Sequence, residues 1–295
     1  MAAARQVTIR EVALRDGLQS EREFVPTEKK LAVIDALSQA GIQCMETTSF
    51  VSPRAIPQLQ DAAELMSRVA RGNIIHEVLV PNLKGAQKAI VSNVDRVVVF
   101  ISASEAHNQA NVGCSIGDSL ADLQTVYSLL KQHQVPAAGI IAVSFGCPYQ
   151  GRVQKTDVLK IAQRFVDWGA DRVMLADTTG MASPAQISEM IGYVQSHLPD
   201  VPLGLHLHNN RGVAMANLYA GYLAGITQFD TSLGGIGGCP NVPLAAGNLA
   251  TEDVVFMFEE MGVATGLDLP GLIRAAQLLE KILQHPLPGR SPTGS

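Results

Sequence analysis

The chain alternates eight times between a short β-rich run and a longer segment with helical periodicity. The β-rich runs begin near Val7, Cys44, Ile74, Arg96, Ala138, Arg172, Leu203 and Gln228. Strands that alternate with helices in this order favour a parallel sheet built from crossover connections. Eight such units predict a closed (β/α)8 barrel of the TIM type. A doubly wound open sheet is the alternative, but it usually has fewer strands and an early glycine-rich phosphate turn, which this sequence lacks.

The predicted barrel occupies about residues 7–262. The apolar spacing within 268–285 predicts one or two additional C-terminal helices, and 286–295 is expected to form a loose tail. No linker rich in Pro, Gly or Ser divides the chain, and 47% hydrophobic residues among 295 suffice for one large core. We therefore expect a single domain over residues 1–295.

Charge and hydropathy exclude several classes of partner. The formal net charge of −5 gives no basic surface for nucleic acid, and no run of 18 apolar residues could span a membrane. The N-terminus has neither an apolar signal region nor a basic presequence. The four cysteines form no CxxC pair, which favours reduced thiols. These features predict a cytoplasmic protein.

The stretch LGLHLHNNRG (203–212) ends the seventh predicted strand with two histidines. Because alternate side chains of a strand share a face, His206 and His208 point the same way, roughly 6.6 Å apart along the strand. Catalytic residues of barrel enzymes gather at this end of the strands. A hydrogen-bonded core histidine is the alternative, but the pair favours a divalent metal site.

Other polar side chains lie in the second predicted strand or at the ends of the first, sixth and eighth. They are Arg15, Asp16, Glu46, Asp177, Cys239 and Asn248. One carboxylate, two imidazoles and an amide oxygen form a mostly hard ligand set, which suits Mg²⁺ or Mn²⁺, although the imidazoles also suit Zn²⁺ or Co²⁺. Asp16 could instead cap a helix, and Asp177 in ADTTG could belong to an ordinary turn. The residues alone leave these alternatives open.

Six segments, in order along the chain, resemble the hydroxymethylglutaryl-CoA lyase family of DRE-TIM metallolyases. They are EVALRDGLQSE, ETTSFVSPRAIPQ, VLVPNLKG, GCPYQG, ADTTG and GGCPNVPLAAGNLATED. The last segment is the most specific, and the resemblance runs from Val7 to beyond Leu269. It implies a barrel enzyme, active as a homodimer or higher oligomer, that cleaves 3-hydroxy-3-methylglutaryl-CoA to acetyl-CoA and acetoacetate.

The resemblance also implies roles for individual residues. The ligands of a divalent cation would be Asp16, His206, His208 and Asn248. Arg15 would hold the thioester oxygen, while Glu46 and Asp177 would support the metal ligands and the polar floor. Cys239 would lie on a mobile glycine-rich loop over the site. These assignments predict one active site at the mouth of the barrel.

The residue types suit such a retro-Claisen cleavage. A metal lowers the pKa of the tertiary hydroxyl group, and a base accepts its proton. His206 is the candidate base, but a nitrogen bound to the metal cannot also take a proton, so Asp16 remains an alternative. Arg15 beside the enolate oxygen would be worth ~3–4 kcal/mol. Cys239 could then protonate the enolate carbon, since a thiol has a pKa of ~8.5.

The sequence departs from the family pattern in places. HLHNNRG replaces an HxHDT-like turn, so Asn209 stands where an aspartate is common and Arg211 could pair with a substrate carboxylate. The loop EAHNQANVG lacks the family's lysines, which leaves Lys84 and Arg152, aided by Lys155, as candidate contacts for coenzyme A. These departures keep a second substrate open, a 3-hydroxy-3-alkylglutaryl-CoA with another group in place of the methyl.

Two further functions remain as alternatives. A condensing enzyme of the same superfamily would join acetyl-CoA to a 2-oxo acid, but such enzymes usually carry an additional C-terminal domain, and this sequence ends at Ser295. A non-catalytic barrel would only bind an acyl-CoA or a protein partner. In that case the predicted metal ligands would be idle.

Overall fold

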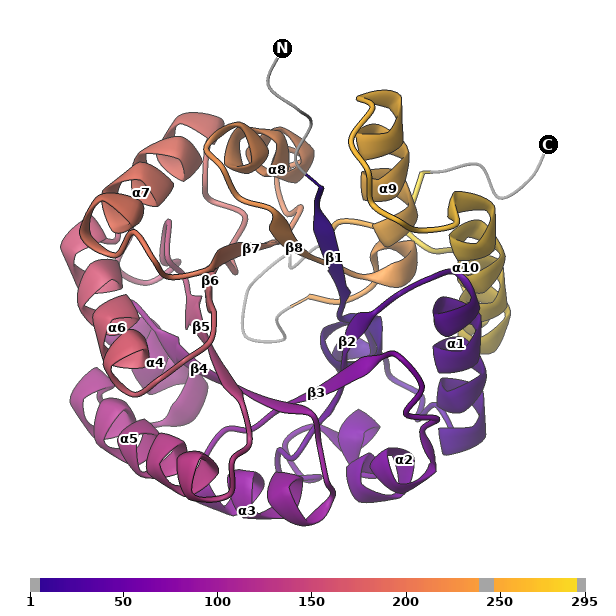
Figure 1. Cartoon of the computed structure of the whole chain (residues 1–295), viewed down its shortest axis with the longest axis horizontal. Helices are drawn as coiled ribbons and strands as arrows, with labels where there is room; N and C mark the ends of the chain where they lie inside the picture. Colours follow the sequence, from indigo (N-terminus) through magenta and orange to yellow (C-terminus); the bar gives the residue numbers. More distant parts are fainter. Residues whose placement is uncertain (1–5, 239–246, 291–295) are drawn as a thin grey trace.

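The computed structural model describes residues 6–238 and 247–290. Eight parallel strands form one closed barrel in the order of the sequence, surrounded by helices (Figure 1). The strands are Thr8–Glu11 (β1), Cys44–Ser49 (β2), Ile75–Leu79 (β3), Arg96–Ser102 (β4), Ala137–Ala142 (β5), Val173–Asp177 (β6), Leu203–Leu207 (β7) and Gln228–Thr231 (β8). The first and last strands pair directly, with Thr8 opposite Gln228 and Arg10 opposite Asp230. The predicted (β/α)8 barrel is confirmed.

The helices lie outside the barrel, between successive strands and after β8. They are Thr27–Gln39 (α1), Ala62–Arg68 (α2), Leu83–Val91 (α3), Glu105–Val112 (α4), Ile116–Gln132 (α5), Lys155–Asp167 (α6), Pro184–His197 (α7), Ala214–Leu223 (α8), Thr251–Glu260 (α9) and Leu269–Leu283 (α10). Shorter helical turns are Ala13–Gly17 (η1), Leu18–Ser20 (η2), Pro57–Leu59 (η3) and Leu233–Gly235 (η4). In the described residues, no helix has the length and apolar character needed to cross a bilayer.

One helix occupies a segment that the sequence analysis treats as a loop. In α4, Ser104 caps the N-terminus, because its hydroxyl accepts a hydrogen bond from the backbone N–H of His107. Gly113 follows in the left-handed conformation with φ of 77° and ends the helix. Ser104 and Gly113 are capping residues that the sequence shows. The segment between them has too few apolar residues to display a helical period, so the helix is not predicted from hydropathy.

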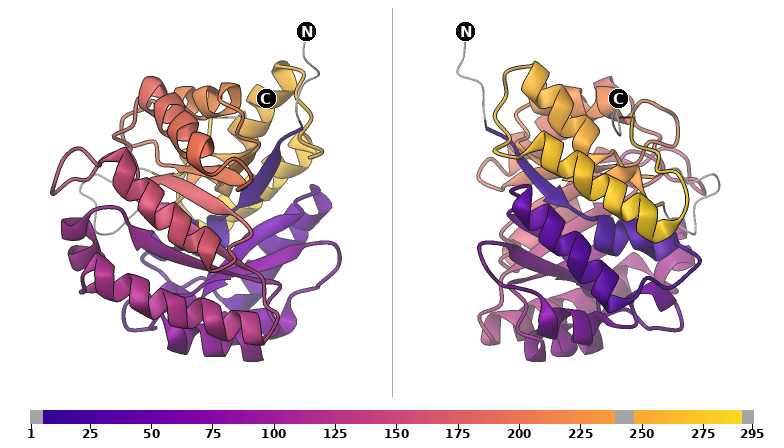
Figure 2. Two further views of the ribbon diagram at one scale, coloured as in Figure 1. Left: turned by 60° about the vertical axis from the view of Figure 1, so that its left-hand side comes forward. Right: turned by 90° about the vertical axis from the view of Figure 1, so that its right-hand side faces the viewer.

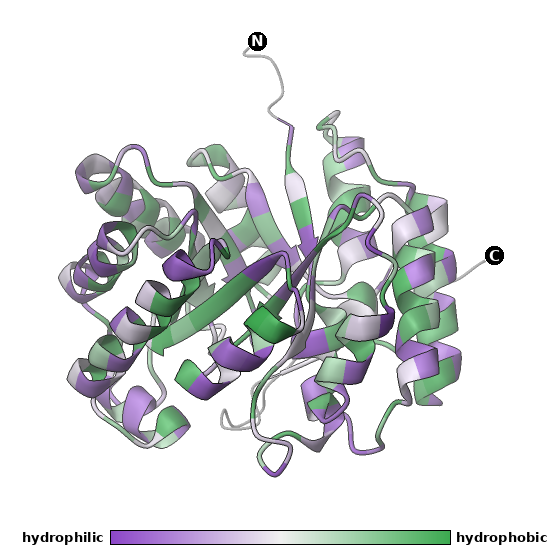
Figure 3. Cartoon of the chain, turned by 60° about the horizontal axis from the view of Figure 1, so that its bottom comes forward, coloured by the Kyte–Doolittle hydropathy of each residue, from purple (hydrophilic) through white to green (hydrophobic). Residues whose placement is uncertain are grey.

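The strands alternate between two environments, as a barrel requires. In β4, Val97, Val99 and Ile101 pack outward against the helices, whereas Val98 and Phe100 belong to a second cluster inside the barrel. Hydropathy colouring shows both hydrophobic and hydrophilic residues on the strands and on the helices (Figure 3). The hydrophobic core is therefore the layer between the strands and the surrounding helices.

The inside of the barrel has an ionic side and an apolar side. The ionic side contains the buried groups Arg10, Glu46, Glu77, Arg172 and Asp230, which form a network of ion pairs. The apolar side consists of Val98, Phe100, Ile140, Met174 and Ala176 from β4, β5 and β6. Only Phe100 in this cluster is half-buried rather than buried. The inside of the barrel is thus polar on one side and apolar on the other.

Helix α10 lies beside α1 on the outside of the barrel (Figure 2). The backbone N–H of Asp268 donates to the carbonyl of Ala40, which ties the start of α10 to the end of α1. The chain then returns toward the barrel, where the N–H of Gly289 donates to the carbonyl of Gly234 at 2.9 Å. Residues 286–290 are therefore held in place, which corrects the prediction of a loose tail for this part of 286–295. Residues 291–295 lie outside the described residues.

Candidate metal centre

The segment after β1 forms a π-helical turn, η1, at the mouth of the barrel. The N–H groups of Arg15, Asp16 and Gly17 all lie within 3.2 Å of the carbonyl oxygen of Val12. This turn buries the side chains of Arg15 and Asp16, which are 9% and 6% exposed. A Cβ atom at Gly17 would lie 2.7 Å from the side chain of Ile236, so glycine allows this close packing.

Asp16 meets both histidines of β7 in the mouth. The Nε2 atoms of His206 and His208 lie 3.0 Å apart. Each lies 3.9 Å from Oδ2 of Asp16, and all three side chains are buried. Within the described ranges, this is the only group of three or more Asp, Glu, His or Cys side chains close enough to share a metal ion. The predicted proximity of these three residues is therefore confirmed.

Asn248 completes the cluster from the segment after β8. Its Nδ2 donates to Oδ2 of Asp16 at 2.7 Å and to the carbonyl of Ile236 at 3.2 Å. Its Oδ1 is buried and has no hydrogen-bond partner among the described residues. Since a buried acceptor is usually satisfied, this oxygen indicates a group that the described part of the chain does not supply. The donor set thus fits a divalent cation, with one carboxylate, two imidazoles and one amide oxygen.

Electrostatics keep Asp16 ionised. Burial opposes its negative charge, but the guanidinium of Arg15 and the two imidazoles outweigh burial and hold its pKa below the ordinary value. Nη1 of Arg15 lies 2.5 Å from Oδ1 of Asp16. Gln19 donates to the same oxygen at 2.9 Å. A carboxylate held in this way is available as a ligand at neutral pH.

Glu46 contacts Arg15 rather than the histidines. Its Oε2 accepts a hydrogen bond from Nη2 of Arg15 at 2.8 Å, and its other oxygen, Oε1, is buried with no partner in residues 6–238 and 247–290. Arg15 is thereby fixed between Asp16 and Glu46. The carboxylate of Glu46 orients the guanidinium group that the sequence analysis assigns to the thioester oxygen.

Asp177 is bound to its own turn. Its carboxylate accepts hydrogen bonds from the backbone N–H groups of Met181 (2.9 Å) and Ala182 (3.1 Å). Burial raises its pKa to about 6. These contacts correspond to the alternative reading of Asp177 as a turn residue. They hold the segment after β6 against the mouth of the barrel.

Three of the remaining predicted residues, Lys84, Arg152 and Lys155, follow the carboxyl ends of β3 and β5. Lys84 is exposed at the start of α3, and Arg152 is exposed in the connection between β5 and α6. Lys155 forms an ion pair with Glu189. Cys239 lies outside the described residues.

Arg211 has a contact that its sequence position did not reveal. Its Nη1 donates to the backbone carbonyls of Thr179 at 2.8 Å and Gly180 at 3.1 Å. Arg211 thus joins the segments that follow β6 and β7. The predicted pairing with a substrate carboxylate would have to compete with these two hydrogen bonds.

Two residues of the site were missed by sequence reasoning. Asp230 of β8 accepts a hydrogen bond from Nδ1 of His206 at 3.0 Å, and Arg10 of β1 binds both oxygens of Asp230. Both are charged residues inside short strands that are otherwise suited to burial. A charged residue within a short strand, Arg10 in VTIREV and Asp230 in QFDTS, could have indicated a buried polar site.

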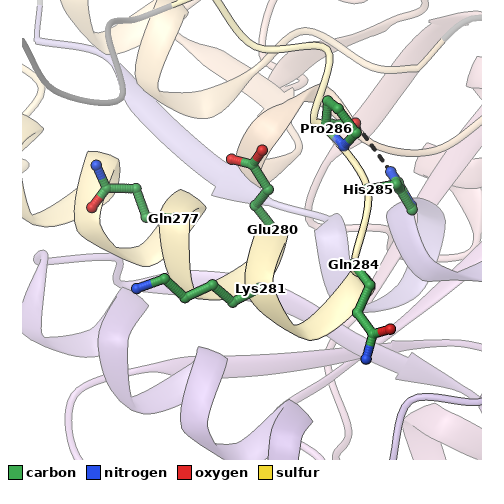
Figure 4. A pocket seen from close by; sticks show the side chains of 6 residues that line it. All are labelled: Gln277, Glu280, Lys281, Gln284, His285 and Pro286. Carbon is green, nitrogen blue, oxygen red and sulfur yellow. Dashed lines mark hydrogen bonds between the residues drawn. The ribbon is translucent and has the colours of Figure 1, made fainter.

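Two hollows lie near the carboxyl ends of the strands. One, of about 540 Å³, is bordered by Asn248, Met215 of α8 and Phe256 of α9. The other, of about 590 Å³, lies along the end of α10, where Lys281 and Gln284 point away from Glu280 (Figure 4). The polar side chains that line this second hollow point in different directions and do not converge on a common ligand position. Only the first borders a residue of the Asp16 cluster.

A closed (β/α)8 barrel with a buried carboxylate and two imidazoles at the carboxyl ends of its strands is the architecture of a metal-dependent barrel enzyme. Comparison with known proteins gives a narrower result. Residues 6–279 match the HMGL-like family model. The chain belongs to the HMGL-like family, which confirms the resemblance seen in the sequence.

Individual relatives are similar over nearly the whole chain. The hydroxymethylglutaryl-CoA lyase YngG of Bacillus subtilis is 37% identical over 99% of this chain and 98% of its own length. A Pseudomonas aeruginosa protein named 3-hydroxy-3-isohexenylglutaryl-CoA/hydroxy-methylglutaryl-CoA lyase is 39% identical over 96% of this chain and 95% of its own. An HMG-CoA lyase from Acinetobacter baumannii, solved with coenzyme A and 3-methylmalate, superposes with a TM-score of 0.93. It is 39% identical and covers 98% of this chain and 94% of its own.

More distant structures share the fold alone. The carboxyl transferase domain of Rhizobium etli pyruvate carboxylase superposes with a TM-score of 0.74 at 15% identity. This likeness supports the barrel architecture and carries no argument about the reaction.

Proposed function

We propose that this protein is a divalent-cation-dependent carbon–carbon lyase that cleaves 3-hydroxy-3-methylglutaryl-CoA to acetyl-CoA and acetoacetate. The observation that carries the proposal is the buried cluster of Asp16, His206 and His208, with two Nε2 atoms 3.0 Å apart and Oδ2 of Asp16 3.9 Å from each. The names of the lyase relatives support the substrate. Asn248, whose Oδ1 is unsatisfied, would be the fourth ligand.

Each residue would contribute a distinct part of the reaction. A bound cation supplies a Lewis acid, which lowers the pKa of a hydroxyl group and fixes its orientation. His206 or Asp16 accepts the proton of the substrate's tertiary hydroxyl. The carbon–carbon bond then breaks, its electron pair passes to the thioester fragment as an enolate, and the hydroxyl carbon becomes the ketone of acetoacetate.

Arg15 would stabilise the enolate. Its guanidinium is fixed by Asp16 and Glu46, so it needs little reorganisation when negative charge develops on the thioester oxygen. The enolate carbon then takes a proton, which gives acetyl-CoA. Cys239 is the proposed donor of that proton. Asp177 would support the site by holding the turn after β6.

The metal and the nucleotide contacts are also proposals. The carboxylate and amide oxygens favour Mg²⁺ or Mn²⁺, while the two imidazoles also suit Zn²⁺ or Co²⁺. Lys84 and Arg152, both exposed and both following strand ends, would contact the phosphates of coenzyme A. A cytoplasmic location and a homodimer or higher oligomer remain predictions from the sequence.

A second substrate is supported by the apolar side of the mouth. Ala142 ends β5 and Ala176 lies opposite His206 in the register of β6 and β7. Both are small, and Phe100, which packs against the cluster that contains Ala176, is only half-buried. This side could receive an alkyl group larger than methyl at the hydroxyl-bearing carbon.

The test is a cleavage assay on protein stripped of divalent ions. Acetyl-CoA and acetoacetate should form in equal amounts from 3-hydroxy-3-methylglutaryl-CoA when Mg²⁺ or Mn²⁺ is added, and not before. Longer 3-alkyl analogues are assayed in parallel, as are 2-oxo acids with acetyl-CoA. Cleavage of only a longer analogue would support the second substrate. Release of free coenzyme A thiol only when a 2-oxo acid is present would show that the protein is a condensing enzyme and not a lyase.

A further inference from the structure

Arg10 lies at the centre of the ionic side of the barrel, beneath the Asp16 cluster. Its Nε and Nη2 each donate to one oxygen of Asp230 at 2.8 Å. Its Nη1 donates to Glu77 at 2.9 Å and to Glu46 at 3.4 Å. One buried guanidinium therefore joins carboxylates from three other strands, β8, β3 and β2.

Two of these carboxylates contact the candidate site itself. Oδ2 of Asp230 accepts from Nδ1 of His206, and Oε2 of Glu46 accepts from Nη2 of Arg15. A carboxylate can only accept, so Asp230 fixes the hydrogen of His206 on Nδ1 and leaves the lone pair of Nε2 facing the cluster. Glu46 sets the orientation of Arg15 in the same way.

We propose that Arg10 is a positioning residue that couples the imidazole of His206 to the guanidinium of Arg15. The inference rests on the cation site of the proposed function and adds a residue that touches neither cation nor substrate. The side chains of Asp230 and Glu46 are fully buried. Without Arg10 these two negative charges would lose the cation between them, and each would shift toward other partners.

The shape of arginine matters as well as its charge. Its planar fork holds both oxygens of Asp230, which fixes the plane of that carboxylate and hence the direction from which His206 donates. Lysine would supply one point charge and could not bind both oxygens in this geometry. Arg10→Lys should therefore restore the charge and only part of the positioning.

The experiment measures Mn²⁺ binding to metal-free protein by electron paramagnetic resonance of the free ion. Arg10→Met should raise the dissociation constant at least about tenfold, as for other groups that orient metal-bound histidines. Arg172→Met is the matched control. Arg172 binds both oxygens of Glu77 at 2.8 and 2.7 Å, so this substitution removes a different cation from the same buried network. It should change the constant less than about threefold. Arg10→Lys should fall between Arg10→Met and wild type.

A double-mutant cycle tests the route. If Arg10 acts through Asp230, Arg10→Met should add little to the weakening already caused by Asp230→Asn. Equal losses in Arg10→Met and Arg172→Met, or unchanged binding in Arg10→Met, would overturn the inference. If circular dichroism shows that Arg10→Met does not fold, the Mn²⁺ dissociation constants of Arg10→Lys and Arg172→Lys are compared instead. Weaker binding in Arg10→Lys than in Arg172→Lys supports the inference, and equal binding overturns it. Absence of Mn²⁺ binding in wild type would instead reject the cation site of the proposed function.

Discussion

Asn248 and Asp16 lie 232 positions apart in the sequence, yet Nδ2 of Asn248 donates to Oδ2 of Asp16 at 2.7 Å. Closure of the barrel creates this contact, because β1 pairs with β8 and brings the segments after both strands together. Oδ1 of Asn248 is left without a partner in the part of the chain that the structure describes. Turning the amide by about 180° would present that oxygen to a cation bound by Asp16.

Loss of the charge at Asp16 should abolish most activity. Asp16→Asn removes the anionic ligand while keeping the shape of the side chain, so the cluster loses its negative charge. We expect kcat to fall at least about a hundredfold and Mn²⁺ binding to weaken. Asp122→Asn, at an exposed position of α5, is the control and should behave as wild type. A kcat within twofold of wild type for Asp16→Asn would show that the ligands are idle.

The apolar side of the mouth should set substrate size. Ala142 is the last residue of β5, and the alternation of that strand directs its side chain inward, like that of Ile140. Ala142→Leu would fill space beside Phe100. We expect the KM for longer 3-alkyl substrates to rise more than the KM for 3-hydroxy-3-methylglutaryl-CoA. Parallel changes for all substrates would place the alkyl group elsewhere.

The titration of Glu11 should make the free energy of unfolding depend on pH. It is buried, accepts hydrogen bonds from the N–H groups of Ala13 and Leu233 and the hydroxyl of Thr251, and has a pKa that burial raises to about 7. A raised folded-state pKa of an acid stabilises the fold at low pH. That contribution is fully present below about pH 4.5, the value for the unfolded chain, and is lost as the pH rises to about 7.

Glu11→Gln removes this titration and keeps the shape. Relative to the variant, wild type should therefore lose up to about 3 kcal/mol of unfolding free energy between about pH 4.5 and 7. Urea unfolding at several pH values measures the difference. Curves that stay parallel over this range would show that Glu11 is ionised throughout. Glu252, whose pKa burial also raises to about 7, should behave similarly when tested alone.

Lys30 should be important for stability although it is remote from the chemistry. Its ammonium is buried and binds Asp61 and the carbonyl of Gln58, each at 2.6 Å. Lys30→Met would leave the Asp61 carboxylate buried without its counter-charge and should cost about 3–5 kcal/mol of unfolding free energy. Arg68→Met, which breaks the exposed pair with Glu28, should cost less than about 1 kcal/mol. Similar losses in urea unfolding for the two variants would contradict this reasoning.

The repeated pattern of strands and helices was sufficient to predict the fold. Eight β-rich runs became eight strands, because each run is short, apolar and bounded by turn residues. The HxH pair was equally informative, since the two-residue period of a strand dictates that His206 and His208 share a face. The proximity of Asp16 followed from the rule that strand ends of a barrel converge.

Other features depend on contacts that no local pattern encodes. Asp230 faces His206, and Arg10 faces Asp230, only because of the registers of β7 with β8 and of β8 with β1. The helix at Glu105–Val112 depends on its end caps rather than on apolar spacing. Residues 286–290 lie against the barrel because the N–H of Gly289 donates a hydrogen bond to the carbonyl of Gly234, which is distant in the sequence.

The most direct test of the account is the anomalous diffraction of crystals soaked in Mn²⁺. We expect one strong peak at the mouth of the barrel, within bonding distance of Nε2 of His206, Nε2 of His208 and a carboxylate oxygen of Asp16. Peaks only elsewhere, in crystals of protein that cleaves 3-hydroxy-3-methylglutaryl-CoA with Mn²⁺, would contradict it.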